Sequence, residues 1–248
     1  MRIILSPAKK MVTDTDSLPW ETLPVFLDDA RRILDRLRGM EYSALKELWN
    51  CNESIAALNA GRLRHCDLGA NLTPAVLSYQ GIQYQYMAPG VLERKPLGYI
   101  QTHLRILSGF YGVLRPFDGV VPYRLEMQAR LDMGAPRGLY GFWGSRLAAS
   151  IYKETDFVLN LASREYSRCV EPYTPAGARF HTCVFGQLLN GRVVEKGTLC
   201  KMARGEMVRW LAENNITSAG ELQYFNGLGY TYAKSLSDES HHVFIKEA

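Results

Sequence analysis

The chain has 248 residues, of which 47% are apolar and 22% are charged, and its formal net charge is +4. This composition excludes wholesale disorder, and no apolar run approaches the ~18 residues that a membrane-spanning helix requires. The five cysteines are odd in number and include no CxxC pair, and the apolar run after Met1 is too short for a signal peptide. We therefore expect a cytoplasmic protein without a disulfide framework.

The first half of the chain predicts one short strand followed by helices. Residues 3–5 are an apolar run ended by a Ser-Pro pair, which predicts a buried strand, and the polar residues 11–22 predict a loop. Apolar residues at helical spacing predict a helix over 25–38, and a glycine ends it. Residues 52–63 begin with a capping asparagine and predict a second helix, and Thr73 is expected to cap a third.

The second half mixes helices and strands without a regular βαβ repeat. Asn190-Gly191 is a two-residue turn signal, so the flanking residues predict a β-hairpin. The other expected elements are helices over 97–107, 139–153 and 197–214, and strands over 157–161, 179–185, 192–195 and 243–246. This mixture predicts a single compact α+β domain over residues 1–248, with a mixed sheet and surrounding helices.

The common catalytic and cofactor signatures are absent from the sequence. It contains no GxxxxGK[ST], no GxGxxG after a strand and no GxSxG. The glycine-rich residues 138–144 begin a predicted helix, where helix packing is a better interpretation than phosphate binding. His65-Cys66 and the pair His181 and Cys183 lack a second ligand pair, so we interpret them as packed cysteines and surface histidines. The sequence predicts no cofactor and no metal site.

The segment 103–131 holds the first candidate for nucleic-acid binding. Gly109 and Gly112 bracket Phe110 and Tyr111 after a predicted helix, which suits a tight turn between helical arms. Such a turn can point successive backbone N–H groups outward, toward a phosphate. The segment therefore resembles a degenerate helix-hairpin-helix DNA-binding element.

Positive charge is concentrated around this segment. Residues 94–146 contain eight basic and three acidic residues, which leaves +5, more than the +4 of the whole chain. Seven of the eight are arginine, which suits bidentate phosphate contacts, and aromatic residues between them can stack on unpaired bases. The alternative is an ordinary charged surface, in which Arg124 and Glu126 form a structural pair.

Two further basic stretches extend the candidate surface. Lys201 and Arg204 lie three residues apart in the helix predicted over 197–214, so they share a face that can follow a phosphate backbone. A solvated helix face explains the same pattern equally well. Lys9 follows the predicted strand at residues 3–5, and a lysine just beyond a strand end is a plausible contact for a phosphate or a carboxylate.

Several motifs together resemble the YaaA, or peroxide stress resistance, family. The matching segments occur in the family's order at residues 4–9, 103–127, 139–144, 160–166, 201–205 and 225–230. Two positions depart from the family pattern: Met202 replaces the second lysine of a KKARG motif, and Gln128 replaces a glycine. Both departures are expected to alter the strength of polyanion binding.

The resemblance implies a function as well as a fold. It implies a compact α+β domain with a helix-hairpin-helix-like element and a positively charged cleft for double-stranded DNA, including bubble-containing or damaged duplexes. It also implies a role in limiting oxidative damage under peroxide, linked to lowered free iron. The residues expected to contact DNA are Lys9, Arg105, Gly109, Tyr111, Gly112, Arg115, Tyr123, Arg124, Lys201 and Arg204.

Two alternatives remain open at this point. Glu126 and Glu165 would repel phosphate on a pure binding surface, so they and Lys9 are candidates for catalysis on a nucleic acid or a nucleotide, with a glutamate as general base. Structural pairing of both glutamates with arginines is the simpler interpretation. The other alternative is direct iron sequestration, for which the candidate ligands are His65, Cys66, His181 and Cys183.

Overall fold

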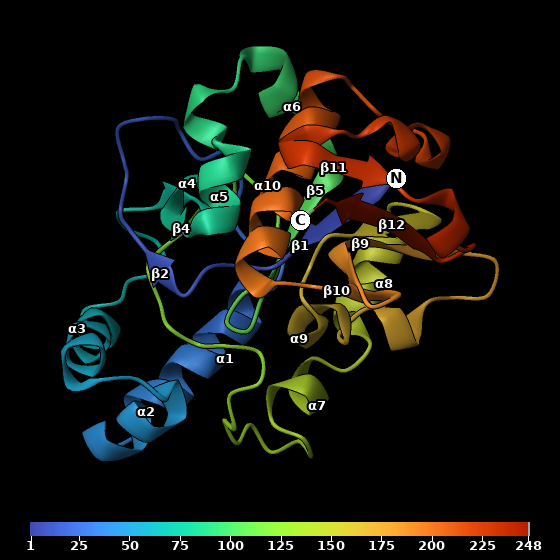
Figure 1. The fold of residues 1–248 in the computed structure, drawn as a ribbon. Helices are drawn as coiled ribbons and strands as arrows, with labels where there is room; N and C mark the ends of the chain where they lie inside the picture. Colours follow the sequence, from blue (N-terminus) through green and yellow to red (C-terminus); the bar gives the residue numbers. More distant parts are fainter. Residues whose placement is uncertain (248) are drawn as a thin grey trace.

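A mixed β-sheet runs through the centre of the molecule in the computed structural model, which describes residues 1–247 (Figure 1). Across the sheet the strands are β11 (Tyr230–Tyr232), β12 (His241–Lys246), β9 (Arg179–Leu189), β8 (Phe157–Asn160), β1 (Arg2–Leu5), β5 (Leu104–Ser108) and β6 (Gly112–Leu114), and β10 (Arg192–Val194) pairs with β9. The inner strands from β12 to β5 are parallel, and the edge strands β11 and β6 are antiparallel to their neighbours.

Strand β1 is the central element of this sheet. Ile4 pairs with Asn160 on one side and with Arg105 on the other, and Ile3, Ile4 and Leu5 are completely buried. A strand covered on both faces needs a continuous apolar run, which is what residues 3–5 provide. From β1 the chain passes to β5 on one side and later to β8 on the other. The strand order therefore reverses direction at β1.

Helices lie around the sheet (Figure 1). Three of them, α1 (Leu27–Arg38), α2 (Tyr42–Trp49) and α3 (Glu53–Arg64), lie at the lower left of the view. The other described α-helices are α4 (Ala75–Ser78), α5 (Ile82–Met87), α6 (Arg94–His103), α7 (Leu139–Trp143), α8 (Arg146–Tyr152), α9 (Arg164–Ser167) and α10 (Gly197–Glu213). Two short ladders, β2 (Lys10–Met11) with β4 (Tyr79–Gln80) and β3 (Thr73–Pro74) with β7 (Gly119–Val120), tie the loops together.

Helix α10 packs directly on α5, and a glycine makes this close approach possible. A Cβ atom at Gly205 would lie 2.0 Å from the carbonyl oxygen of Gln83. No side chain fits at that distance, so the backbones of the two helices are almost in contact. The contact fixes where α10 places its neighbouring cations. No helix in residues 1–247 combines the length and the apolar composition that a bilayer crossing requires.

Most of the predicted elements are present at the expected places. The strand at residues 3–5, the helices over 25–38, 52–63 and 197–214, and the strands over 157–161 and 243–246 are confirmed. Asn52 caps α3 by accepting a hydrogen bond from the backbone N–H of Ile55. Asn190 and Gly191 both have positive φ, as a two-residue hairpin turn between β9 and β10 requires.

Three predictions of secondary-structure elements were wrong. The helix predicted over 97–107 ends at His103, and β5 begins at the next residue, because residues 104–108 are buried in the sheet. The helix predicted over 139–153 is divided into α7 and α8 at Gly144, whose φ is +51°. Thr73 does not cap a helix: it belongs to β3, and its hydroxyl accepts the backbone N–H of Asp14.

The predicted helix-hairpin-helix-like element is absent from residues 103–114, all of which the structure describes. Ser108 pairs with Gly112 in an antiparallel β-hairpin of β5 and β6. The backbone N–H groups of Phe110 and Tyr111, predicted to point outward, donate to the hydroxyl of Ser108 instead. The turn lies inside the protein because both aromatic side chains are 1% exposed.

Candidate binding cleft at the carboxyl edge of the sheet

A cleft of about 430 Å³ opens where the inner strands β1 and β8 end. Its walls are the loop after β1, the end of β4 with the start of α5, the segment 123–126, the residues after β8, and one face of α10. In open sheets of parallel strands, ligands bind beyond the carboxyl ends of the strands, at the point where the strand order reverses. The cleft occupies that position in this molecule.

The floor of the cleft is held by hydrogen bonds from three segments. The carbonyl oxygen of Ser6 accepts from Gln83 Nε2 at 2.9 Å and from the hydroxyl of Tyr84 at 3.0 Å. The hydroxyl oxygen of Ser6 accepts the backbone N–H of Ser163 at 2.8 Å. The loop after β1 is therefore fixed to α5 on one side and to the end of β8 on the other. This anchoring fixes the position of the backbone from which the Lys9 side chain extends.

Glu126 is the paired carboxylate of the cleft. Its oxygens lie 2.8 Å from Lys9 Nζ and 3.5 Å from Arg124 Nη2. The Glu126 side chain is 18% exposed and that of Lys9 is 65% exposed, so the cation stands at the mouth of the cleft. Arg124 and Glu126 thus form the structural pair that the sequence analysis considered. Lys9 joins them as a third member.

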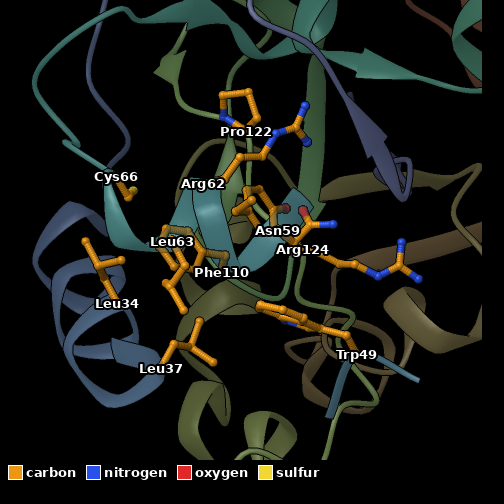
Figure 2. A pocket seen from close by; sticks show the side chains of 11 residues that line it. Leu34, Leu37, Trp49, Asn59, Arg62, Leu63, Cys66, Phe110, Pro122 and Arg124 are labelled. Carbon is orange, nitrogen blue, oxygen red and sulfur yellow. The ribbon is translucent and has the colours of Figure 1, made fainter. Parts of the chain in front are cut away.

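Arg124 and Arg204 retain unused hydrogen-bonding capacity. Their side chains are 10% and 15% exposed. Within the described residues, the buried Nε of each has no hydrogen-bond partner. Arg204 also approaches Glu195 at 3.6 Å. Figure 2 shows that the guanidinium of Arg124 extends away from Leu34, Leu37 and Leu63, which border a small apolar cavity at the base of its side chain. Both arginines line the cleft, and their carboxylate partners at 3.5 and 3.6 Å lie beyond the usual length of a charge-assisted hydrogen bond, so both suit an anionic ligand.

Glu165 is a carboxylate without an ion pair in the part of the chain that the structure describes. One of its oxygens accepts the backbone N–H of Gln128 at 3.3 Å. Burial raises the pKa of Glu165, and the negative charge of Glu126 adds to the increase, while the Gln128 N–H and Lys9 oppose it. The ionised form of Glu165 is therefore poorly compensated compared with that of Glu126.

Tyr123 contributes its ring to the cleft and its hydroxyl to the interior. The hydroxyl lies 2.6 Å from that of Ser108 and 2.8 Å from that of Tyr79. Burial raises the pKa of Tyr123 to about 12, so its hydroxyl is neutral. The ring stacks on Phe110 with a centroid distance of 4.9 Å. Because the hydroxyl is already used, only the ring of Tyr123 is available to a ligand.

The structure brings together five of the ten predicted DNA contacts and two catalytic candidates. Those that line the cleft are Lys9, Tyr123, Arg124, Lys201 and Arg204, together with the catalytic candidates Glu126 and Glu165. Sequence reasoning missed Gln83 and Tyr84, which come from α5, a helix that it did not predict. The one available signal was Gly205, because a glycine inside a long helix often marks a close approach.

The other predicted DNA contacts lie elsewhere, and four of them are buried. Arg105 is 4% exposed and is bound to Glu154. Tyr111 is 1% exposed, and its hydroxyl accepts the backbone N–H of Val121. Gly109 lies against the backbone of residues 125–127, and Gly112 lies against Leu147, Trp143 and Phe26. These four residues cannot reach a DNA backbone. Arg115 is 43% exposed but lies beside Glu154, outside the cleft.

The side chains considered as iron ligands are not gathered around a common point. Within residues 1–247, no three His, Cys, Asp or Glu side chains are arranged to hold a metal ion. Cys183 is buried, which raises the pKa of its thiol to about 12, and His181 lies edge-on to Phe157. Burial also raises the pKa of the Cys66, Cys169 and Cys200 thiols, so these four cysteines are not activated as thiolates.

Comparisons with known proteins agree with the sequence motifs. The profile of the peroxide stress protein YaaA family matches residues 1–236. A UPF0246 protein of Lachnoclostridium phytofermentans is 52% identical over 99% of this chain and 96% of its own length. UPF0246 proteins of Pediococcus pentosaceus and Agathobacter rectalis are 50% and 48% identical, each over at least 98% of both chains. The chain therefore belongs to the peroxide stress protein YaaA family, as its motifs predicted.

Proposed function

We propose that this protein acts in the peroxide stress response by binding DNA through the cleft at the carboxyl edge of the sheet. The observation that carries the proposal is the pair of cleft arginines, Arg124 and Arg204, whose carboxylate partners lie as far away as 3.5 and 3.6 Å. Lys9 and Lys201 add positive charge at the exposed rim. The proposal includes the lowering of free iron that the family resemblance implies.

The size of the cleft supports distorted DNA as the partner. A hollow of about 430 Å³ is within the range for small ligands and does not enclose a double helix. A phosphate with one displaced nucleotide fits such a hollow. Duplex DNA with unpaired bases supplies such a nucleotide without the cost of opening a base pair.

Fluorescence anisotropy tests the proposal with labelled duplex, single-stranded and bubble-containing DNA over a range of salt concentrations. We expect the bubble-containing DNA to bind most tightly, and affinity to fall steeply with salt because each phosphate contact releases counterions. Lys201→Ala is expected to weaken binding several-fold. Lys153→Ala is the matched control, because Lys153 is exposed and lies outside the cleft. This substitution removes the same charge as Lys201→Ala. Binding that is independent of salt, or equally weakened by both variants, contradicts the proposal.

Catalysis on a nucleic acid or nucleotide is the second candidate function, and one observation favours it. The two carboxylates of the cleft have different environments: Glu126 is paired with Lys9, whereas burial raises the pKa of Glu165. Such separation is typical of acid and base pairs in active sites. If the cleft is catalytic, Glu126→Gln retains DNA affinity but abolishes peroxide resistance in cells. Loss of both together, or of neither, speaks against catalysis.

A further inference from the structure

The cleft contains a carboxylate that a phosphate-binding site does not need. Glu165 lines the same hollow as Arg124 and Arg204, and no described cation lies within ion-pair distance of it. Negative charge at this point repels the phosphate that the arginines attract. The conflict disappears if the ligand has an anionic part for the arginines and a separate donor part for Glu165.

The walls of the cleft suit a flat ring between these two parts. Tyr84, Tyr123 and Tyr166 all line it, and the hydroxyls of Tyr84 and Tyr123 are bound within the protein. Tyr84 and Tyr166 are 4% and 5% exposed, so the half-buried ring of Tyr123 offers most of the aromatic contact to a base. The cleft thus combines cations, ring surfaces and one acceptor, which is the set of groups that a nucleotide requires.

The chemistry of a carboxylate restricts the base. An ionised carboxylate only accepts hydrogen bonds, and its two oxygens match a pair of parallel N–H donors. The Watson–Crick edge of guanine presents two adjacent donors, N1–H and the N2 amino group. Adenine and cytosine present one amino group beside an acceptor nitrogen, and thymine presents one N–H between two carbonyls. Guanine alone among the four bases satisfies both oxygens of a carboxylate.

We propose that the cleft holds one unpaired guanine nucleotide, with its phosphate at Arg124 and Arg204 and its Watson–Crick edge at Glu165. The base must be unpaired because pairing occupies the two donors that Glu165 accepts. Burial raises the pKa of Glu165 in the free protein, so its ionised form gains from two N–H donors. This inference rests on the proposed function, since it identifies the nucleotide at the same cleft.

Isothermal titration calorimetry with single nucleotides tests the inference on the unmodified protein. The probes are dGMP, dAMP, dCMP, TMP and deoxyinosine monophosphate, which has the N1–H of guanine but lacks its amino group. We expect dGMP to bind about tenfold or more tightly than each of the others, as a bidentate base contact provides. Binding of dGMP that is no tighter than that of deoxyinosine monophosphate overturns the inference without requiring any variant.

Glu165→Gln assigns the preference to one residue. An amide presents one donor and one acceptor, so the variant is expected to bind dGMP about tenfold more weakly and to lose the distinction from the inosine nucleotide. Glu171→Gln, an exposed position outside the cleft, is the matched control and is expected to retain the preference. Retention of the guanine preference in Glu165→Gln also overturns the inference.

The outcomes separate this inference from the proposed function. Salt-dependent DNA binding that Lys201→Ala weakens, without a guanine preference, leaves the proposed function intact and removes the inference. A guanine preference for single nucleotides without any DNA binding leaves the inference and removes the proposed function. Absence of both DNA and nucleotide binding removes both.

Discussion

Two groups of arginines at opposite edges of the sheet show how differently the same side chain is used. The Glu154 cluster, at the amino end of β1, consists of Glu154 with Arg2, Arg105 and Arg115. There, Arg105 donates to Glu154 and to the backbone carbonyls of residues 101, 102 and 104. At the carboxyl edge, Arg124 and Arg204 each keep a buried Nε without a partner in residues 1–247.

The difference is one of hydrogen-bond satisfaction. In the Glu154 cluster, Arg105 is almost fully buried and its donors are directed to oxygen atoms of the protein itself, so it stabilises the fold. In the cleft, Arg124 and Arg204 are more exposed, at 10% and 15%, and their carboxylate partners are too distant for strong hydrogen bonds, so a ligand can bind them. Net charge along the sequence does not distinguish the two cases. The partners of each guanidinium do.

Removing Arg105 tests the structural side of this comparison with the largest expected effect. Arg105→Ala removes the most buried donor to Glu154 and the shared donor of three backbone carbonyls, so we expect a loss of about 3 kcal/mol in the free energy of unfolding. Urea denaturation measures it. Arg31→Ala removes an exposed arginine paired with Asp28 and is expected to cost less than about 1 kcal/mol. Equal costs for the two variants mean that the Glu154 cluster is not structural.

Gly205→Ala tests whether the α10–α5 contact positions the cleft cations. Its Cβ would lie 2.0 Å from the carbonyl oxygen of Gln83, so α10 must move away from α5. We expect a loss of about 1–3 kcal/mol in stability and weaker DNA binding. In Gly61→Ala, the new Cβ meets nothing within 4 Å, and replacing a helical glycine is expected to stabilise the protein by up to about 1 kcal/mol. Unchanged stability and affinity in Gly205→Ala contradict the positioning role.

The pH dependence of stability at Asp118, which is bonded to the backbone of Arg115 in the Glu154 cluster, provides a test with a smaller expected effect. Burial raises the pKa of Asp118 from 3.8 to about 6, against the opposing hydrogen bonds from Thr22 and from the backbone N–H of Arg115. Between these pH values the folded state binds more protons than the unfolded state, so the contribution of Asp118 to stability falls as pH rises. Thermal denaturation from pH 4 to pH 6 measures this decrease in stability. We expect the decrease to be smaller in Asp118→Asn than in the unmodified protein. An unchanged slope contradicts a raised pKa at Asp118.

The sequence predicts local structure where one short segment determines the result. Residues 3–5 are apolar enough to form a strand covered on both faces, and Asn190-Gly191 tolerates the positive φ values of its turn. Lys9 could be placed near the site because it follows a buried strand. Lys201 and Arg204 could be placed on one helix face because of their spacing.

Sequence reasoning failed where partners distant in the chain decide the structure. Residues 104–107 look helical in isolation but become a strand because β1 pairs with them. The turn N–H groups at Phe110 and Tyr111 are satisfied by Ser108, so they do not face a phosphate. Arg105 is buried by Glu154, which lies 49 residues away. The contribution of α5 to the cleft depends on a close contact with Gly205, which one isolated glycine only suggests.

The salt dependence of DNA binding tests most directly the claim that the carboxyl-edge arginines bind the ligand and the Glu154 cluster does not. Arg124→Ala and Arg115→Ala each remove one positive charge, one from each group. We predict that Arg124→Ala binds bubble-containing DNA about tenfold more weakly and lowers the slope of log K against log salt by about one, whereas Arg115→Ala changes neither. Equal effects of the two substitutions, or a larger effect of Arg115→Ala, would contradict the account.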